Sequence, residues 1–534
     1  MKRTTSHRRS AAVFLAATIA AASTATLVAA GGATATSATA AASAATPVGP
    51  IEIRVDSGDP GTPFPHFWET MFGSGRAVLA LRDNYRKDVR LVKSVTEFKH
   101  VRFHGIFHDE VGLYDVDAKG KSIYNFSYID QIYDGLLSDG VRPFVELSFM
   151  PKKLASDPKG IFEFWYRPNV SPPKDYVRWD AMIEAFARHL VERYGIDEVS
   201  QWYFEVWNEP NIGFWGGKPY QGTYFTLYDH TAKAIKSANP RLLIGGPSTA
   251  QAAWARVFIE HCKKHGIPVD FVSSHVYAND SPQNVFHSNT PVARDQMVCK
   301  SVRKVHDEIK ASSMPQLPLI FSEYNASYAN EPNVTDSVYM GPWLATTIAQ
   351  CDGMTEGMSY WSFSDVFEES GVVKTPFYGG FGLVAEDDIP KPAYNAFALL
   401  HRLGEVRLKS GSDSALVTKR RDGTVVIALW NYAPPDATGE KYVPPGPPGV
   451  SKSFTIALPS VTGNRNASIW RVDRDHGNVI KAFDAMGRPA FPSRDQITEL
   501  REAAKLTAPE VMPVKDGKLQ TEVPAQGLAV IEIH

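Results

Sequence analysis

The chain has 534 residues, of which 43% are hydrophobic and 11% aromatic, and its formal net charge is −2. This length exceeds one compact hydrophobic core, so we expect two structured domains. The near-neutral charge argues against electrostatic binding of nucleic acid, and no polybasic patch indicates binding to a membrane. A carbohydrate partner fits better, because sugars are held by aromatic faces and hydrogen bonds.

The N-terminal segment has the pattern of a secretory signal. Basic residues ending in Arg8 and Arg9 precede the apolar stretch 11–22, and small residues follow. We therefore expect residues 1–30 to be a signal peptide and the protein to be secreted, either extracellular or periplasmic. The arginine pair leaves the twin-arginine route open beside general secretion. Residues 31–50 are rich in Ala and Thr and are predicted to form a disordered linker.

Two further sequence features limit the class of protein. No later run is long and apolar enough to span a bilayer. Cys262, Cys299 and Cys351 are too few and too scattered for a disulfide framework or a metal cage. Buried thiols are the default expectation, and one disulfide remains an open alternative.

Between about 67 and 403, short apolar runs alternate with amphipathic stretches of helical length, which predicts a (β/α)8 TIM barrel with enlarged loops over 59–403. A doubly wound open sheet is the rival, and it is disfavoured because no glycine-rich phosphate turn opens the first helix. The predicted strands are 67–73, 100–106, 143–149, 202–207, 242–246, 271–277, 319–324 and 358–363. The predicted helices include 175–194, 222–238, 254–265, 294–311 and 336–351.

After Gly404 the pattern changes to short β-rich runs separated by Pro/Gly turns, which predicts an accessory C-terminal β-sandwich over 404–534. Residues 51–57 are a candidate for one more strand, which would join the two ends of the chain. A helix is expected over 492–505. The predicted strands of this domain are 415–418, 424–430, 452–458, 467–472 and 528–533.

Polar residues concentrate where the predicted barrel strands end. In a (β/α)8 barrel, the C-terminal ends of the strands face the active site. Repetition of this placement across five strands predicts a functional site. The residues at these ends are Arg102, His104, Asn208, Glu209, His275, Tyr277, Glu323, Trp361 and, just beyond, Asp365.

Glu209 and Glu323 are the predicted catalytic pair. Cleavage of a glycosidic bond needs one carboxyl to protonate the leaving oxygen and another to meet the positive charge that develops on the sugar. Taken singly, Glu209 is also compatible with a helix cap or an arginine partner, and Glu323 with an exposed loop. Their positions at the ends of two strands of one predicted barrel favour catalysis.

The neighbouring strand ends predict contacts to substrate. Asn208 is expected to hydrogen-bond a sugar hydroxyl next to the reacting carbon. His104 and His275 are expected to bind sugar hydroxyls or to orient the carboxylates, with buried histidines satisfied by the backbone as the alternative. Tyr277 is expected to donate to the carboxylate of Glu323 and keep it ionised, with a core tyrosine as the alternative. We predict no metal ligand at this site and no cofactor.

The residues at the end of the eighth predicted strand indicate their roles less clearly. Trp361 and Phe363 are candidates for a stacking wall, although this strand also needs core aromatics. Asp365, Glu368 and Glu369 either hold distal hydroxyls or form a solvated loop. We expect one of these three to contact substrate, and Asp365 and Glu368 are the predicted binding residues among them.

Together these segments resemble glycoside hydrolase family 39, the family of β-xylosidases and α-L-iduronidases. The likeness covers about 67–403, and the Asn-Glu-Pro motif alone is shared by a wider clan of barrels. The matching stretches are 73–77 (GSGRA), 101–105 (VRFHG), 109–112 (DEVG), 205–211 (EVWNEPN), 227–236 (LYDHTAKAIK), 273–277 (SSHVY), 322–325 (SEYN) and 360–368 (YWSFSDVFE).

The resemblance implies that Glu209 is the acid/base and Glu323 the nucleophile of a retaining enzyme. The two carboxyl groups should then lie ~5–5.5 Å apart, not the ~6.5–9.5 Å of an inverting pair. Residues 361–368 are similar to the β-xylosidase branch. An iduronidase would need a cation for the substrate carboxylate, and Lys374 is the nearest candidate in the sequence.

The sequence therefore predicts a secreted retaining exo-glycosidase acting on plant-type oligosaccharides or polysaccharides, with β-xylosidase activity preferred. An α-L-arabinosidase is the runner-up, and an exopolysaccharide glycosidase is a further alternative. From a different class, the chain could be a non-catalytic carbohydrate-binding barrel, against which the presence of both carboxylates argues. The sequence makes no prediction of the oligomeric state.

Overall fold

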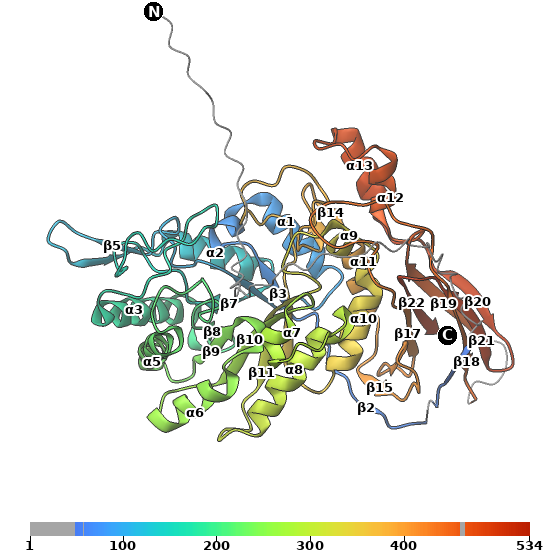
Figure 1. Ribbon diagram of the computed structural model, residues 1–534, viewed down its shortest axis with the longest axis horizontal. Coiled ribbons are helices and arrows are strands. Elements are labelled where there is room, and N and C mark those ends of the chain that lie inside the picture. The colour runs from blue at the N-terminus through green and yellow to red at the C-terminus, as the bar shows by residue number, and fades with distance from the viewer. Residues whose placement is uncertain (1–48, 57, 460–464) are drawn as a thin grey trace, which may run out of the picture. The chain divides into compact units, whose positions relative to one another are not determined.

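The computed structural model describes residues 49–56, 58–459 and 465–534 (Figure 1). The predicted signal peptide and all but the last two residues of the predicted linker lie outside these residues. The described residues 49–534 belong to one compact unit.

Eight parallel strands form a closed barrel, so the predicted fold class is confirmed and the open sheet is excluded. Each strand pairs with the next barrel strand along the chain, and the last pairs with the first. The strands are β3 (Met71–Ser74), β4 (His100–Phe103), β7 (Arg142–Glu146), β8 (Tyr203–Glu205), β9 (Leu243–Thr249), β10 (Phe271–Tyr277), β11 (Leu319–Asn325) and β12 (Gly357–Tyr360).

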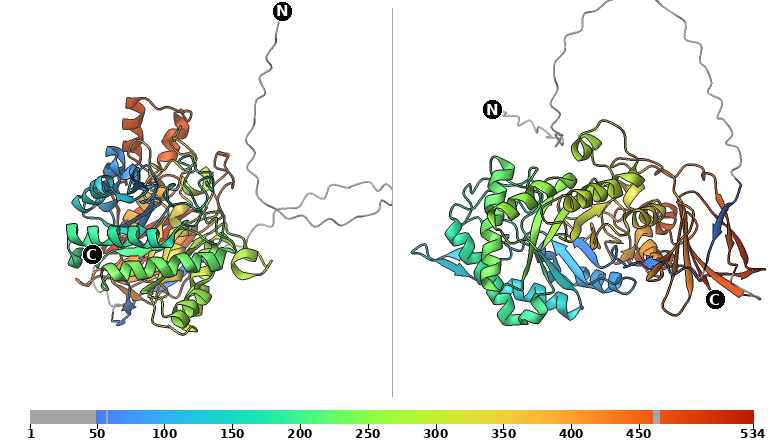
Figure 2. Two further views of the ribbon diagram at one scale, coloured as in Figure 1. Left: turned by 90° about the vertical axis from the view of Figure 1, so that its left-hand side faces the viewer. Right: turned by 90° about the horizontal axis from the view of Figure 1, so that it is seen from below.

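Helices surround the barrel (Figures 1 and 2). They are α1 (Asp83–Lys93), α2 (Ser127–Ser138), α3 (Tyr176–Tyr194), α4 (Ile196–Val199), α5 (Tyr220–Ala238), α6 (Ala255–His265), α7 (Pro282–Phe286), α8 (Arg294–Lys310), α9 (Pro332–Thr335), α10 (Met340–Cys351) and α11 (Pro392–Leu400), with the short 3₁₀ turns η1 (Ala77–Leu81) and η2 (Ala250–Ala252).

Helix α3 illustrates how the sequence sets these helices. Asp175 caps its N-terminus by accepting hydrogen bonds from two backbone N–H groups, and Gly195 ends it with φ at +81°. Its buried face follows the helical period and includes Trp179, Met182 and Phe186. Burial of each such side chain contributes about 1.5–3 kcal/mol.

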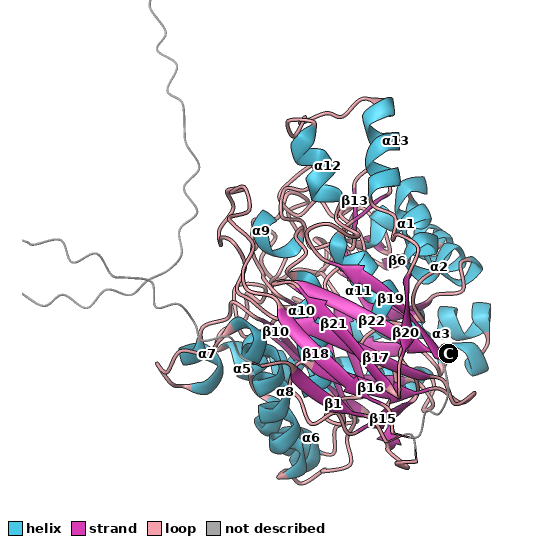
Figure 3. Ribbon diagram, turned by 90° about the vertical axis from the view of Figure 1, so that its right-hand side faces the viewer, coloured by secondary structure: helices cyan, strands magenta, loops and turns pink. Residues whose placement is uncertain are grey.

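Two sheets form a β-sandwich beside the barrel (Figure 3). The small sheet has the order β1-β18-β21, and the large sheet has the order β2-β15-β16-β17-β22-β19-β20. Their strands are β1 (Ile51–Arg54), β2 (Thr62–Pro63), β15 (Val406–Leu408), β16 (Ala415–Lys419), β17 (Val425–Asn431), β18 (Lys452–Ala457), β19 (Arg465–Val472), β20 (Glu510–Val514), β21 (Lys518–Val523) and β22 (Gly527–Ile533).

The sandwich has a core of its own and a second, shared interface. Ile53 of β1 lies opposite Ile456 of β18 in a parallel pair, so the N-terminal segment does add a strand to this domain. The two sheets enclose an apolar core that includes both side chains and Ile531. The opposite face of the large sheet contributes Trp430 and Leu528 to the cluster that also contains the barrel core.

Smaller elements lie on loops. They are the hairpins β5 (Tyr114–Val116) with β6 (Ser122–Tyr124) and β13 (Val384–Ala385) with β14 (Ile389–Pro390), and the helices α12 (Val479–Ala485) and α13 (Arg494–Ala503). Helix α13 corresponds to the helix expected over 492–505. Together α12 and α13 pack against the loop that follows β12, through Phe483 and Leu500 against Phe377 and Ile389.

The expectation of three buried thiols is wrong for two of the cysteines. Cys299 of α8 and Cys351 of α10 form a disulfide across 52 residues, while Cys262 is a buried free thiol. The pairing follows from the adjacency of two outer helices, which no local spacing of cysteines reveals. Among the described helices, none has the length and apolar composition needed to cross a membrane.

Candidate active site

A cavity of about 300 Å³ opens at the C-terminal ends of the barrel strands. This is the end at which barrels of this class carry their active sites. Its lining residues are His104, Phe164, Asn208, Glu209, Ile212, Phe214, Ala250, Gln251, Tyr277, Asp280, Glu323, Tyr328, Trp361, Glu369 and Phe381.

Glu209 and Glu323 lie close together in the lining of this cavity. A carboxylate oxygen of each and a ring nitrogen of His275 lie within 4.8 Å of one another. Both side chains are largely buried, with residue exposures of 8% for Glu209 and 4% for Glu323. This closeness fits the ~5–5.5 Å separation of a retaining pair and not the ~6.5–9.5 Å of an inverting pair.

Glu323 is held by donors on both carboxylate oxygens. Nη1 of Arg102 donates to Oε1 at 2.7 Å, and the hydroxyl of Tyr277 donates to Oε2 at 2.6 Å. Burial raises the pKa of Glu323, while the positive charges of Arg102 and His104 and the hydrogen bond from Tyr277 oppose that rise. These contacts favour the ionised carboxylate.

Glu209 has a different environment. Burial raises the pKa of Glu209 well above its usual range, and the negative charges of Glu323 and Asp280 raise it further. Its carboxylate oxygen Oε1 lies 3.1 Å from Nδ1 of His275. Its backbone has a φ of +44° and its N–H donates to the carbonyl of Ser248 at 2.8 Å. Of the two carboxyl groups, Glu209 therefore holds a proton more strongly than Glu323.

Arg102 of β4 is the central cation of the site. Its guanidinium contacts Glu146, Glu205 and Glu323 at 2.7–2.8 Å, and it donates to Oδ1 of Asn208 at 2.9 Å. Arg102 lies at a predicted strand end, but its position in the sequence does not by itself indicate a role. The available signal was an arginine between two apolar residues of a buried strand, because such an arginine requires carboxylate partners.

The two histidines of the site, His104 and His275, have different partners and different pKa shifts. Nδ1 of His104 lies 2.7 Å from Glu146, and the ring lines the cavity. Burial by itself lowers the pKa of His104, but the Glu146 carboxylate raises it above its ordinary value. Burial lowers the pKa of His275 well below its ordinary value, and the charges of Arg102 and His104 add to this. His275 is therefore neutral beside Glu209.

His275, Glu209 and Glu323 are also the residue types that bind metals. Arg102 and Tyr277 already occupy the oxygens of Glu323, and Arg102 supplies the positive charge that a cation would supply. The donor set therefore fits proton transfer and nucleophilic chemistry, for which no ion is required.

Three of the four carbohydrate contacts expected at the end of the eighth strand do not line the cavity, and one does. Trp361 lines the cavity. Phe363 is fully buried and packs against Tyr85 and Phe98, with ring centroids 5.0 and 5.5 Å apart. Beyond Tyr360 the chain leaves the strand, so the alternation that would have kept Phe363 on the same face as Trp361 does not continue.

The carboxylates Asp365 and Glu368 also point away from the cavity. Asp365 forms an ion pair at 2.5 Å with Lys391, which is fully buried. Glu368 pairs with Arg76 at 3.1 Å and with Arg82 at 2.5 Å. A buried carboxylate is stabilised by a cation, and in both cases the cation comes from a distant segment that the local sequence does not identify.

Glu369 is the carboxylate of this loop that faces the cavity. Burial raises the pKa of Glu369 to about 8, and its Oε1 lies 3.6 Å from Nε2 of His104. The aromatic residues Phe164, Phe214 and Tyr328 of other loops also line the cavity. The sequence does not identify these three aromatic residues, because irregular loops carry no periodic signal.

No lysine or arginine is among the described residues that line the cavity. Lys374 is exposed and is not one of them. Four carboxyl groups line it instead, those of Glu209, Asp280, Glu323 and Glu369. This wall suits a neutral ligand with hydroxyl groups better than an anionic one.

Comparisons with known proteins agree with this geometry. Residues 51–520 match the sequence model of Glycosyl hydrolases family 39. A β-xylosidase of Geobacillus stearothermophilus is 36% identical over 466 residues, which are 85% of this chain and 90% of that protein. The crystal structure of a monomeric β-xylosidase from Caulobacter crescentus superposes with a TM-score of 0.82 at 33% identity, covering 91% of this chain and 99% of that one. The crystal structure of the GH39 enzyme from Xanthomonas axonopodis pv. citri gives a TM-score of 0.80 at 32% identity, covering 91% and 97%.

Proposed function

Because the chain belongs to glycosyl hydrolases family 39, we propose that it is a secreted β-xylosidase that releases terminal xylose from plant-type oligosaccharides with retention of anomeric configuration. The observation that carries this proposal is the close pairing of Glu209 and Glu323 in unequal environments. The β-xylosidases among the relatives favour xylose as the sugar.

In the first step, a carboxylate oxygen of Glu323 attacks the anomeric carbon. The bond from that carbon to the leaving oxygen breaks, and Glu209 gives its proton to this oxygen. Arg102 and Tyr277 hold Glu323 ionised and oriented for this attack. The product is a covalent ester between the sugar and Glu323.

In the second step, Glu209 changes from acid to base. Formation of the ester removes the negative charge of Glu323, which is one of the causes that raise the pKa of Glu209. Glu209 then takes a proton from a water molecule, whose oxygen attacks the anomeric carbon. The ester bond breaks and Glu323 becomes a carboxylate again.

The shape and charge of the cavity support a small neutral sugar. Its volume of about 300 Å³ is at the lower end of ligand pockets, which favours cleavage at a chain end. A uronic acid needs a cationic partner, and no lysine or arginine is among the described lining residues. These two features favour a pentoside over an iduronide.

Secretion is supported by the N-terminal sequence. Basic residues, an apolar stretch over 11–22 and small residues follow one another as in a signal peptide. Action outside the cytoplasm would place the enzyme with fragments of extracellular polysaccharide. Fractionation of cells that express the whole chain, followed by N-terminal sequencing of the released protein, tests this part of the proposal.

A panel of 4-nitrophenyl glycosides tests the activity. We expect the β-xyloside to have the highest kcat/KM, above the α-arabinofuranoside, α-arabinopyranoside, β-galactoside and α-iduronide. A higher kcat/KM on an arabinoside would contradict the choice of xylose but leave the catalytic pair intact. No turnover of any glycoside would contradict enzymatic function and favour a carbohydrate-binding barrel.

Two substitutions test the assigned roles. Glu323→Ala should remove nearly all turnover on every glycoside. Glu209→Ala should lower kcat/KM about 10²- to 10⁴-fold on glycosides with poor leaving groups and much less on the nitrophenyl glycoside. Azide should restore turnover of Glu209→Ala by attacking the glycosyl-enzyme.

Glu163→Ala is the matched control, because Glu163 is an exposed loop carboxylate that does not line the cavity. It should have the kinetics of the unmodified enzyme. Equal losses in Glu209→Ala on good and poor leaving groups, without an effect of azide, would show that Glu209 is not the acid/base.

A further inference from the structure

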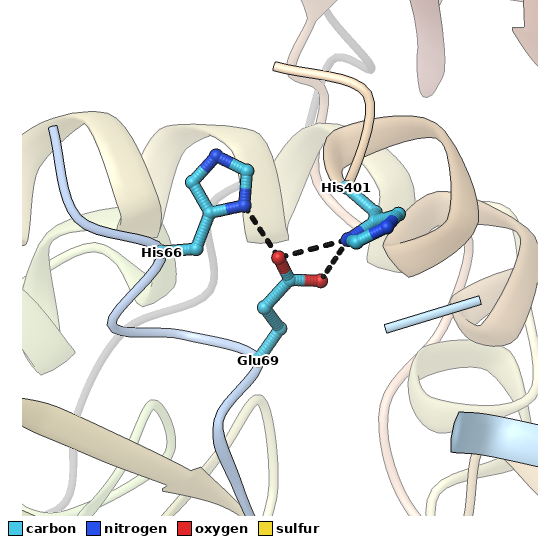
Figure 4. A group of neighbouring side chains, drawn as sticks. All are labelled: His66, Glu69 and His401. Atoms are coloured by element: carbon cyan, nitrogen blue, oxygen red, sulfur yellow. Dashed lines mark hydrogen bonds and ion pairs between the residues drawn. The ribbon is translucent and has the colours of Figure 1, made fainter. Parts of the chain in front are cut away.

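A second group of potential metal ligands lies away from the cavity that contains Glu209 and Glu323. His66, Glu69 and His401 point toward one another (Figure 4), and one donor atom of each lies within 4.8 Å of the others. Nδ1 of His66 lies 2.5 Å from Oε1 of Glu69. Nδ1 of His401 lies 3.0 Å from Oε1 and 2.9 Å from Oε2 of the same carboxylate.

The burial of Glu69 distinguishes this group from a surface cluster. Its side chain is fully buried, whereas the side chain of His66 is 12% exposed and that of His401 is 41% exposed. Within the described residues, these two imidazoles are the only ion-pair or side-chain hydrogen-bond partners of Glu69. A buried carboxylate without lysine or arginine is expensive unless a cation compensates it.

The cluster lies at the end of the barrel opposite to the catalytic pair. His66 and Glu69 precede β3, and His401 directly follows α11. A cavity of about 640 Å³ is lined by both histidines and provides a path from solvent. The other charged residues that line this cavity have no net charge, because three are acidic and three are basic. They are Glu97, Glu356 and Glu405, and Lys99, Arg420 and Arg421. Selection of a cation would therefore depend on the three donors themselves.

We propose that His66, Glu69 and His401 bind one Zn²⁺ ion, with water from this cavity as the fourth ligand. Two imidazoles and one carboxylate with an open position form a known ligand set for zinc. Zn–N and Zn–O distances of about 2.0–2.1 Å place tetrahedral donors about 3.3 Å apart. The nitrogen-to-oxygen distances of 2.5 and 3.0 Å from His66 and His401 to Oε1 of Glu69 are shorter than this spacing, and all three donors lie within 4.8 Å of one another. Imidazole donors disfavour Ca²⁺ and Mg²⁺, which prefer oxygen ligands.

The ion would stabilise the place where the barrel closes and the sandwich begins. Here β12 pairs with β3, and β2 pairs with β15. The N–H of Phe64 donates to the carbonyl of Glu405 at 2.7 Å, close to both histidines in sequence. A zinc ion would cross-link the segment that enters β3 to the end of α11. Its effect is on stability, since residues at this end of a barrel take no part in catalysis.

Zinc binding can be measured directly on the purified enzyme after removal of metals with EDTA. We expect isothermal titration with ZnCl2 to give one ion per chain and a rise in the thermal midpoint that EDTA reverses. Loss of a residue that only orients a metal ligand weakens metal binding about 10- to 100-fold. Loss of a ligand itself, in His401→Ala, should therefore weaken zinc binding by at least this factor. Since His401 is partly exposed, this variant should fold. Glu69→Gln is a second variant that preserves side-chain volume.

His189→Ala is the matched control, because His189 pairs with Asp130 at 2.6 Å without a third ligand. It should bind zinc as the unmodified enzyme does. Unchanged affinity in His401→Ala, or no binding by the unmodified enzyme, would overturn the proposal. Loss of binding in Glu323→Ala, with inhibition of glycosidase activity by zinc, would place the ion at the catalytic pair instead and would also overturn it.

Discussion

At the scale of single residues, the site depends on how two chemically identical side chains become different. Glu323 accepts hydrogen bonds from Arg102 and Tyr277, whereas Glu209 faces the neutral ring of His275. Burial raises the pKa of both carboxyl groups, but the cation acts mainly on Glu323. Like-charge repulsion then favours a single proton, held by Glu209. This asymmetry assigns the acid and the nucleophile.

Tyr277→Phe tests this asymmetry through the pH dependence of kcat/KM. The hydroxyl donates to the ionised form of Glu323, so its removal should raise the pKa of that carboxyl. Activity requires Glu323 ionised and Glu209 protonated, so the acid limb belongs to Glu323 and the alkaline limb to Glu209. We expect the acid limb to move to higher pH by about 1–2 units and the maximum of kcat/KM to fall.

Tyr328→Phe provides the comparison for this profile. Tyr328 lines the same cavity and its ring packs edge-on against Tyr277 at 6.2 Å, but its hydroxyl donates to no carboxylate among the described residues. The acid limb of the kcat/KM profile of Tyr328→Phe should therefore stay at the pH of the unmodified enzyme. An unchanged acid limb in Tyr277→Phe would mean that the hydrogen bond does not control ionisation of Glu323.

The residues that sequence reasoning identified have a common property. Glu209, Tyr277 and Glu323 lie near the C-terminal ends of regular strands, where chain position alone indicates which end of the barrel they occupy. Phe363 and Glu368 lie beyond the end of β12, where the side-chain direction no longer follows an alternation. Their packing and ion pairs depend on distant segments, so the local sequence could not predict them.

At the scale of elements, the loop after β12 determines one wall of the cavity. It carries Trp361, Glu369 and Phe381, and a buried lysine fixes it. Nζ of Lys391 contacts Asp365 at 2.5 Å and donates to the carbonyl of Gly380 at 3.0 Å. Lysine is thus the cation that holds an irregular segment in one conformation.

Replacement of this lysine should affect both stability and substrate binding. Lys391→Met leaves the carboxylates of Asp365 and Asp336 buried without their cation, which should lower the free energy of unfolding by about 3–5 kcal/mol. Displacement of the loop should also raise KM. Guanidinium unfolding curves and initial-rate kinetics measure the two effects.

A triple variant, Lys391→Met with Asp336→Asn and Asp365→Asn, separates charge from packing. It should regain part of the lost stability, because no unpaired charge remains buried. Equal stability of Lys391→Met and the unmodified enzyme would show that the triad does not hold the loop.

The elements themselves were accessible from sequence to different degrees. Each of the eight barrel strands contains or adjoins a short apolar run, because both faces of the barrel sheet are buried, and this signal located all of them. In the sandwich, β20 is mostly exposed and was not predicted. Strand β21 was also missed, although Leu519, Thr521 and Val523 alternate with exposed residues as in a half-buried strand.

At the scale of the whole molecule, the first and last strands of the described residues belong to the sandwich that packs against the barrel. Strand β1 pairs with β18, and the large sheet of the sandwich packs against the core that includes α10 and α11. The disulfide from Cys299 to Cys351 joins α8 to α10 on the outside of the barrel. These connections hold the strands whose ends carry Glu209 and Glu323 in a fixed arrangement.

The stereochemistry of the first product tests the central claim most directly. Two carboxylates this close leave no room for a water molecule between nucleophile and sugar, so the reaction should proceed with retention. Proton NMR of 4-nitrophenyl β-xyloside hydrolysis in D2O should show β-xylose first, with α-xylose arising later by mutarotation. Initial appearance of α-xylose would mean that the reaction inverts, and it would contradict the assignment of Glu323 as a nucleophile.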